Sequence, residues 1–397
     1  MRATRPPGRL AVERVNVGRY EERIVAGERV RAFVPAPLPP DPPIALDGGL
    51  QQLLVDAAMA LGRIDGASQT LPDAELLTYA YVRKEAVLSS QIEGTQSSLS
   101  DLMRFEAGAA PGVPLDDVRE VVNYVAAMEH GLERLRGDFP LSNRLIREIH
   151  AILMRSGRGS DKTPGEFRRS QNWIGGARPG NAAYVPPPHT EVADCMGALE
   201  AFLHTEDDGL PVLLRAAIAH VQFETIHPFL DGNGRTGRLL ITFLLCQAGM
   251  LRDPVLYLSL YFKQHRERYY DLLDNVRRTG DWEAWLRFFL EGVRDTAESV
   301  VATAQRLYEI FRDDRDRISA GSRAGSLLRV HQHLMRSPIL SVTEARRLTG
   351  LSYSACASAL AQLENLGVAR EITGRRRGRL FVYDRYLAIL HQETEPL

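Results

Sequence analysis

Between two strongly apolar segments the chain reads His227-Pro228-Phe229-Leu230-Asp231-Gly232-Asn233-Gly234-Arg235-Thr236-Gly237-Arg238. Apolar residues recur at three- and four-residue spacing over 212–226 and over 234–249, which predicts a helix on each side. The proline and the glycines in between predict a tight loop. This stretch is therefore expected to end one buried helix and to begin the next, within a mainly α-helical fold.

The loop has a composition suited to an anion. Glycines at positions 232, 234 and 237 allow backbone N–H groups to point into one concavity, because no Cβ obstructs the required dihedral angles. The N-terminus of the following helix adds a partial positive charge. Arg235 and Arg238 lie three residues apart on its first turn and can hold phosphate oxygens in pairs. These features predict a phosphate site.

Two further side chains of the loop supply chemistry beside that site. Asp231 is a hard oxygen ligand, suited to Mg²⁺ that is shared with phosphate groups. His227 is the group in this loop that can accept a proton near neutral pH. A base, a metal ligand and a phosphate site together indicate transfer of a phosphoryl or nucleotidyl group, in which positioning and charge neutralisation supply most of the rate.

The loop also resembles the signature of the Fic family, H-[PX]-F-x-[D/E]-G-N-G-R-x-x-R, at every signature position. The segment EFRRSQNWIGG at 166–176 resembles the stretch that leads into the β-hairpin flap of this family, and the similarity extends over about residues 45–310. It implies a Fic-type helical core with a β-hairpin flap over 171–187. The flap is expected to pair with an extended segment of a target protein through main-chain hydrogen bonds.

The resemblance implies a protein adenylyltransferase, which transfers AMP from ATP to a Ser, Thr or Tyr hydroxyl of a protein and releases pyrophosphate. On this reading His227 takes the hydroxyl proton, Asp231 holds Mg²⁺, Arg235 supports the β-phosphate and Arg238 binds the γ-phosphate. Tyr269 is expected to contact the nucleoside, with the adjacent tyrosine as the alternative. The residues expected to bind ATP are Glu93, Gly232, Asn233, Gly234, Arg235, Thr236, Gly237, Arg238 and Tyr269.

A second motif precedes this core. Ser89-Ser-Gln-Ile-Glu93-Gly94 resembles the inhibitory motif of the family, [S/T]-x-x-x-E-[G/N]. A glycine that ends a helix would fix Glu93 at the helix terminus, and a pair between its carboxylate and Arg238 would keep that arginine from the γ-phosphate. The resemblance implies autoinhibition in cis or across a homodimer. It leaves open that the enzyme also removes AMP and modifies itself.

Changes in composition divide the chain into segments. Residues 1–45 contain a proline-dense stretch and are expected to form an extended arm strapped onto the next domain. An N-terminal helical domain with the inhibitory helix is expected over 46–110, and the catalytic core over 111–312. The charged and then small residues of 313–325 predict a linker.

Residues 326–397 predict a winged helix-turn-helix domain, because three short helix patterns precede two strand-like segments around a basic tip. From Ala320 onward the chain has eleven arginines against six acidic residues. Contact with DNA through 352–366 and the tip is one interpretation, and a dimerisation or protein-docking module is the other. The alternatives to AMP transfer are therefore a nucleotide-sensing DNA-binding regulator, or transfer of another phosphate-containing group such as UMP or phosphocholine.

The overall composition excludes several other classes of protein. Lys and Arg total 49 and Asp and Glu total 50, a net charge of −1, which argues against a chain that coats nucleic acid or an acidic membrane along its length. Three widely spaced cysteines fit neither a disulfide framework nor a zinc site. The chain shows no apolar segment typical of a signal peptide or of a membrane span. We expect a cytoplasmic protein without a membrane contact.

Overall fold

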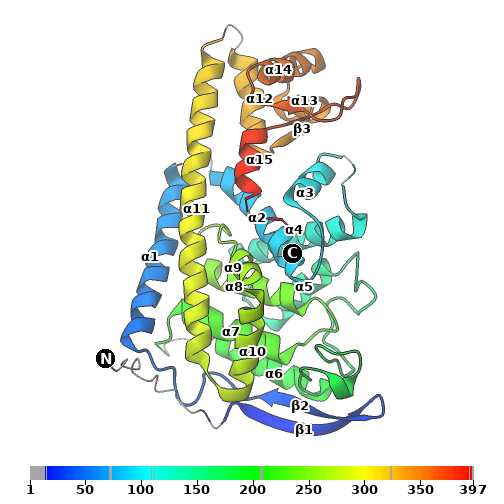
Figure 1. The fold of residues 1–397 in the computed structure, drawn as a ribbon, viewed down its shortest axis with the longest axis vertical. Coiled ribbons are helices and arrows are strands. Elements are labelled where there is room, and N and C mark those ends of the chain that lie inside the picture. Colours follow the sequence, from blue (N-terminus) through cyan, green and yellow to red (C-terminus); the bar gives the residue numbers. More distant parts are fainter. Residues whose placement is uncertain are drawn as a thin grey trace, which may run out of the picture.

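Helices form most of the chain, and two small β-sheets lie near its opposite ends (Figure 1). The computed structural model describes residues 14, 16–70, 74–108, 110, 112–205, 209–321, 324–392 and 394–395. The α-helices within these ranges are α1 (Gly48–Thr70), α2 (Ala74–Ile92), α3 (Leu99–Glu106), α4 (Leu115–Arg136), α5 (Asn143–Leu153), α6 (Val192–Leu203), α7 (Val212–Ile226), α8 (Asn233–Gln247), α9 (Ser259–Gln264), α10 (Arg266–Thr279), α11 (Trp282–Ser319), α12 (Ala324–Arg336), α13 (Val342–Thr349), α14 (Tyr353–Asn365) and α15 (Asp384–Leu390).

The expected mainly helical fold is confirmed. Most helices coincide with the periodic segments of the sequence. Helices α3, α9 and α15 were not predicted from the pattern. They have 8, 6 and 7 residues, which is too short to display a helical period clearly.

The N-terminal arm contains a β-hairpin that the sequence did not fully predict. Strand β1 (Gly18–Val25) pairs antiparallel with β2 (Glu28–Pro35). The proline-rich segment after β2 lies against the helices, since Gln222 of α7 donates a hydrogen bond to Ala36 O (2.9 Å). The arm is thus a hairpin followed by a strap, and residues 1–13 and 15 lie outside the described ranges.

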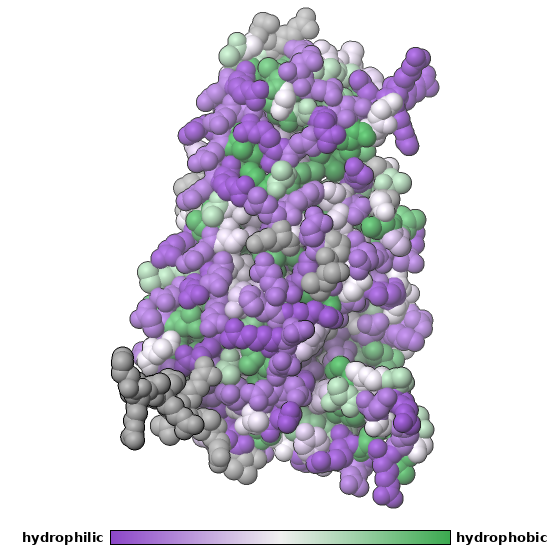
Figure 2. All heavy atoms as spheres, in the orientation of Figure 1, coloured by the Kyte–Doolittle hydropathy of each residue, from purple (hydrophilic) through white to green (hydrophobic). Residues whose placement is uncertain are grey.

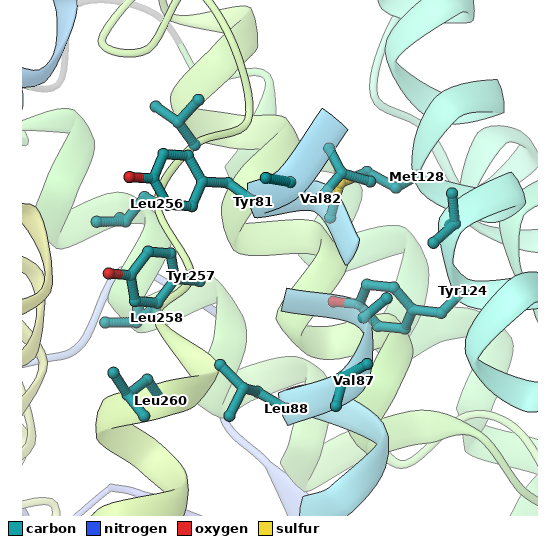
Figure 3. Close-up of a cluster of buried hydrophobic side chains, with 14 of the residues drawn as sticks. Tyr81, Val82, Val87, Leu88, Tyr124, Met128, Leu256, Tyr257, Leu258 and Leu260 are labelled. Atoms are coloured by element: carbon teal, nitrogen blue, oxygen red, sulfur yellow. The ribbon is translucent and has the colours of Figure 1, made fainter. Parts of the chain in front are cut away.

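Helix α2, which carries the predicted inhibitory motif, is fixed by the main hydrophobic core (Figure 3). The rings of Tyr81 in α2 and Tyr257 lie 5.3 Å apart, and both side chains are fully buried. On the opposite side of α2, Val87 lies toward Tyr124 of α4 in Figure 3, and Tyr124 is also fully buried. This packing on two sides holds the end of α2 against the rest of the core.

Helices α7 and α8 form the central pair, and both are buried along most of their length. The loop between them turns into α8 at Gly232, the N-cap residue, whose φ is 75°. A positive φ costs glycine little, because it has no Cβ. This glycine therefore allows the chain to leave the α7 terminus and begin α8 within a few residues.

Helix α11 corrects the predicted linker, because it continues without a break to Ser319 and runs along much of the molecule (Figure 1). The charged part of α11 after residue 311 is stabilised by contacts of Asp314. The buried carboxylate of Asp314 accepts hydrogen bonds from Tyr383 OH (2.6 Å) and Arg385 Nη1 (2.8 Å). The helix ends only a few residues before α12, and residues 322–323 lie outside the described ranges.

The C-terminal part combines helices α12 to α15 with a small antiparallel sheet. Its strands are β3 (Ile339–Ser341), β4 (Arg370–Glu371) and β5 (Leu380–Val382), in the order β3-β5-β4. The last described residues return to the end of α2, where Gln91 Nε2 donates a hydrogen bond to Thr394 O (2.9 Å). The C-terminal part therefore contacts the helix that precedes Glu93.

The surface gives no indication of a membrane-spanning segment in the described ranges. None of their helices combines the length and the apolar character that a membrane span requires. Figure 2 shows hydrophilic side chains over most of the visible face, with smaller hydrophobic patches between them.

Candidate active site

A cleft of about 760 Å³ lies between the α7–α8 loop, helix α10 and the 171–187 loop. This volume is within the range of small-molecule sites. Five of the predicted residues line it, namely Glu93, His227, Gly234, Arg238 and Tyr269. The other lining residues are Trp173, Ile174, Gly175, Ala183, Tyr184, Glu224, Arg266, Tyr270, Asp271, Leu273, Asp274 and Arg277.

His227 follows α7 in the left-handed conformation (φ 49°, ψ 60°), which is uncommon for a residue other than glycine. Its N–H donates to Phe223 O (2.9 Å), and its carbonyl accepts from Arg168 Nε (3.0 Å). The Nδ1 atom is buried and has no hydrogen-bond partner among the residues that the structure describes. Burial, together with the charge of Arg168, lowers the pKa of the imidazole to about 4. The ring is therefore neutral at pH 7 and able to accept a proton.

Arg168 fixes the His227 loop and was missed in the sequence analysis. Besides His227 O, its guanidinium donates to Pro187 O (2.5 Å), and its backbone N–H donates to Pro228 O (2.9 Å). Burial lowers its pKa to about 10, so it remains charged at neutral pH. The sequence shows two adjacent arginines here, and only the structure distinguishes buried Arg168 from exposed Arg169.

Asn233 holds the loop together instead of presenting its side chain to the cleft. Its Oδ1 accepts from Phe229 N and its Nδ2 donates to Phe229 O, both at 2.9 Å. Phe229 is fully buried and stacks on His150, with ring centroids 3.6 Å apart. His150 accepts from Gly165 N (2.8 Å), and its Nε2 therefore donates to Asp231 O (2.9 Å). The amide expected to bind phosphate is thus occupied by the backbone of its own loop.

Asp231 lies at the surface beside this loop, with 47% of its side chain exposed. Its Oδ1 accepts from Gly232 N (2.6 Å). Within the described ranges no three His, Cys, Asp or Glu side chains gather into a metal cluster. A single accessible carboxylate is nevertheless the protein ligand that Mg²⁺ uses when substrate phosphates supply further oxygens. Asp231 therefore fits a magnesium ion that is bound together with a nucleotide.

Arg238 is engaged by the motif at the end of α2. It donates from Nε to Ser89 Oγ (2.8 Å), and from Nη2 to Ser89 O (3.0 Å) and Glu93 Oε1 (2.6 Å). Gly94 follows with φ 94°, and a Cβ added to Gly234 would lie 2.3 Å from Glu93 Oε1. Burial disfavours the charged forms of Glu93 and Arg238. The attraction between the two opposite charges outweighs burial, so the pKa of Glu93 is lowered and the pKa of Arg238 is raised. The predicted contact between the motif and Arg238 is therefore present.

Arg235 does not line the cleft, contrary to its expected position at the β-phosphate. Its Nη1 donates to Glu120 Oε2 (3.0 Å) in α4, and its Nη2 lies 3.4 Å from Met154 Sδ. The two charged side chains are 4% and 1% exposed. The buried carboxylate of Glu120, which comes from a distant part of the chain, explains why the arginine turns inward.

The remaining residues of the signature support helix α8. Thr236 Oγ1 donates to Gly232 O (2.8 Å), a bond that closes the first turn. The carbonyl of Gly237 accepts from His220 Nδ1 (2.9 Å), and an added Cβ there would lie 2.4 Å from Glu224 Oε1. The structure therefore explains these residues by local packing rather than by side-chain contact with a nucleotide.

The two adjacent tyrosines of α10 have different environments. Tyr269 is 1% exposed, and its hydroxyl donates to His220 Nε2 (2.9 Å), whose other nitrogen donates to Gly237 O. Tyr270 also lines the cleft and is 41% exposed. The accessible ring surface is therefore that of Tyr270, whereas Tyr269 forms part of the floor.

The loop expected to be a flap forms a minimal β-hairpin. Ile174 and Tyr184 exchange backbone hydrogen bonds of 2.8 and 3.0 Å. On one side the hairpin meets β2, where Phe33 N donates to Val185 O (2.9 Å). Ile174 and its neighbours line the cleft. The N-terminal hairpin thus supports the flap from the side of Val185.

Glu224 is a further cleft residue that the sequence analysis did not select. It lies on α7 one turn before His227 and is 8% exposed, and its Oε1 has no hydrogen-bond partner in the described part of the chain. In the sequence, its position three residues before the candidate base His227 indicates that the two side chains can lie near each other. Arg168, His150 and Glu120 gave no comparable signal, because the fold brings them to the site from distant segments.

Comparisons with known proteins agree with this geometry. The model described as Fic/DOC family N-terminal matches residues 51–133, and the model described as Fic/DOC family matches residues 140–245. Two relatives named protein adenylyltransferase Fic, from Aedes aegypti and Culex quinquefasciatus, are each 34% identical to the chain, over 245 and 212 residues. These matches cover 60% and 52% of the chain but only 45% and 39% of the relatives, so the chain spans less than half of their length.

Solved structures show the same fold. A Fic family protein from Desulfovibrio desulfuricans G20 has a TM-score of 0.57 at 20% identity, over 86% of this chain and 97% of that one. Fic-1 from C. elegans, residues 134–508, has a TM-score of 0.50 at 21% identity, over 64% and 73% of the two chains. The solved structures show the shared fold. The two family matches, the second of which includes the loop at 227–238, identify residues 51–133 and 140–245 as the two segments of a Fic/DOC family protein.

Proposed function

We propose that this protein is an adenylyltransferase that transfers AMP from ATP to a Ser, Thr or Tyr hydroxyl of a target protein. The observation that carries the proposal is the arrangement of one cleft. A neutral histidine, His227, lies beside the start of α8, and Arg238 in the same cleft is blocked by Glu93. The relatives named protein adenylyltransferase support this activity.

In the proposed reaction the hydroxyl oxygen of the target attacks the α-phosphorus of ATP. A new O–P bond forms, the bond to the pyrophosphate oxygen breaks, and pyrophosphate leaves. His227 accepts the hydroxyl proton, because its ring is unprotonated at neutral pH. The choice of the α-phosphorus rests on the resemblance to the family.

The negative charge of the triphosphate would be met by the N-terminus of α8 and by Arg238 once Glu93 is displaced. Asp231 would hold Mg²⁺, which neutralises phosphate charge when it is bound. The backbone bonds from Arg168 keep His227 in its left-handed conformation. Positioning and electrostatics are the main contributions to this type of transfer.

Glu93 is the inhibitory group in this proposal. Its carboxylate accepts a hydrogen bond from the guanidinium of Arg238, which a γ-phosphate would need. The carboxylate also lies against Gly234 at the start of α8. The contact lies within one chain, which favours inhibition in cis over inhibition across a homodimer. Opening the site requires that the end of α2 move away from Arg238.

The proposal can be tested with ATP labelled at the α or the γ position, using purified Glu93→Gly protein with cell lysate. Transfer of label from the α position to a protein supports transfer of AMP. Label on the enzyme itself, resolved by gel electrophoresis, would show that it also modifies itself. Label from the γ position alone would indicate a kinase. No label in Glu93→Gly protein that binds ATP would contradict the proposal. Labelled UTP and CDP-choline test the alternative groups. Removal of AMP is tested by adding wild-type protein, which retains Glu93, to the labelled target after ATP and pyrophosphate have been removed, and measuring loss of label.

A second candidate function concerns the C-terminal part, which we propose to be a winged helix-turn-helix module that binds duplex DNA. Arg375, Arg376 and Arg377 are exposed between β4 and β5, and the N-terminal end of α14 is exposed at Ser352 and Tyr353. Exposed cations and an accessible helix terminus suit contact with phosphates and a groove. A salt-dependent mobility shift that Arg375→Glu abolishes would support DNA binding, whereas no shift at low salt would contradict it.

A further inference from the structure

Two buried glutamates lie near Arg238 and differ in how their carboxylates are satisfied. Glu85 of α2 is 3% exposed and is fully engaged by the protein. It accepts from Ser259 N (3.1 Å), Ser259 Oγ (2.5 Å) and Tyr124 OH (3.2 Å). A buried carboxyl group with these partners is part of the structural core.

Glu224 of α7 is buried to a similar degree, at 8% exposed, but its Oε1 receives no hydrogen bond from any described residue. The residue lines the cleft that contains His227 and Arg238. Leaving a buried polar atom without a partner costs free energy, typically about 1–3 kcal/mol, and a ligand that supplies a partner to such an atom recovers this free energy. Oε1 lies against Gly237 of α8 while the residue lines the cleft, so a donor that enters the cleft beside Glu224 would supply the partner that this carboxyl group lacks.

The packing around Glu224 leaves space for its carboxyl group. A Cβ at Gly237 would lie only 2.4 Å from Glu224 Oε1, so the glycine in the second turn of α8 provides the necessary space. Arg238, Glu93 and Arg277 are its charged neighbours, and burial dominates over them in raising its pKa to about 7. The charge of Glu224 also contributes to raising the pKa of both tyrosines of α10, Tyr269 and Tyr270. Glu224 thus lines one cleft together with Arg238, the proposed phosphate-binding arginine, and with Tyr270, whose ring is accessible.

When it is ionised, Glu224 repels phosphate groups and therefore favours an uncharged part of a bound nucleotide beside it. Asp271 and Asp274 of α10 line the same cleft and add to this restriction. Building on the proposed function, we propose that Glu224 determines nucleoside specificity by accepting a hydrogen bond from an O–H or N–H donor of the nucleoside. The donor is either a ribose hydroxyl or the exocyclic amino group of adenine.

Calorimetric titration of ATP into the full chain tests this proposal, with Glu93→Gly as the common background. We expect Glu224→Leu to weaken ATP binding by roughly 10–100-fold, the loss typical of a hydrogen bond to a charged group. Glu224→Gln retains an accepting oxygen and should lose less. Glu85→Gln is the matched control, since it alters a buried glutamate near Arg238 that does not line the main cleft. It is expected to lower the melting temperature without changing ATP affinity.

Nucleotide analogues distinguish the two possible donors. We would titrate 2′-deoxy-ATP, 3′-deoxy-ATP and purine riboside triphosphate, which lacks the amino group, into the Glu93→Gly protein with and without Glu224→Leu. The analogue that lacks the partner of Glu224 should bind the two proteins equally, because the interaction has already been removed. Equal losses on Glu224→Leu for ATP and all three analogues would overturn the proposal. So would an unchanged dissociation constant for ATP.

The same proteins separate this inference from the proposed function. If Glu93→Gly protein transfers no α-label but its ATP affinity depends on Glu224, the proposed transfer is wrong and the nucleoside contact stands. If it transfers label and Glu224→Leu binds ATP with unchanged affinity, the nucleoside contact is wrong. Melting temperatures verify that each variant is folded. If Glu224→Leu does not fold, the same analogue titrations with Glu224→Gln test whether Glu224 contacts the nucleoside.

Discussion

Glu93 Oε1 lies 2.6 Å from Arg238 Nη2, although the two residues are 145 positions apart in the chain. Ser89, one helical turn earlier, binds the same guanidinium twice. The end of α2 therefore places three acceptors around one arginine of α8. Because that arginine lines the cleft with His227, the proposed function predicts that breaking this contact allows a triphosphate to be bound there in full.

Replacement of Glu93 by glycine should release Arg238 for a γ-phosphate. We expect the rate of AMP incorporation to rise by about tenfold or more, since an interaction that excludes the productive nucleotide pose is removed. Transfer of α-label to protein measures the change. Glu93→Gln, which keeps the size but not the charge, should fall between wild type and glycine. A folded Glu93→Gly protein with wild-type activity would exclude the inhibitory role.

Activity in the Glu93→Gly background should depend on pH through His227. Its pKa is about 4, and the charge of Glu93 contributes to raising it, so removal of Glu93 lowers it further. A base must be unprotonated, so the rate should be level between about pH 6 and 8 and should fall only at lower pH. His227→Ala should reduce the rate by about 10²–10⁴-fold. An acidic limb near pH 6.5 would indicate that the histidine has an ordinary pKa.

The buried pair between Arg235 and Glu120 should support the fold. Glu120→Gln leaves the buried guanidinium without its charged partner, which typically costs about 3–5 kcal/mol. Urea unfolding followed by circular dichroism measures the loss. Arg158→Gln is the matched control: it binds the same carboxylate, but 54% of its side chain is exposed, so the cost should stay below about 1 kcal/mol. Equal effects of the two variants would contradict the interior position of Arg235.

Glu224 should make the protein less stable at higher pH. Its pKa in the folded chain is about 7, raised by burial from the ordinary value of 4.5, so folding opposes its ionisation. Wild type therefore loses stability as the pH rises from about 4.5 through 7, on the order of 3 kcal/mol at most, and Glu224→Gln does not. The difference in melting temperature between the variant and wild type should be small at pH 5 and largest at pH 8. A constant difference would show that Glu224 has an ordinary pKa.

Most helices could be predicted from the sequence, because a buried helix face imposes its period directly on the chain. Helices of two turns, such as α9, show too little of that period. The end of α11 was predicted too early, since its last turns are stabilised by a contact between Asp314 and Tyr383. Composition favours a linker there, and a distant partner reverses that preference.

The same division applies to the site. The loop at 227–238 and the motif at 89–94 are local patterns, and the sequence alone was enough to select the candidate base, the glycine-containing loop and the glutamate that contacts Arg238. Roles that depend on partners from elsewhere were assigned less well. Asn233 and Arg235 have the expected side chains for binding phosphate, but Phe229 and Glu120 occupy them.

The sequence by itself therefore determined the family, the helical fold and the candidate base, because these follow from residue type and spacing within short segments. Only the tertiary structure decided which charged groups face the cleft and which are paired inside. Arg238 and Arg235 lie on one turn of α8, yet one meets Glu93 beside the cleft and the other meets Glu120 in the core. The physical reason is that burial and ion pairing depend on the groups that the fold brings within a few ångströms, and no local pattern records them.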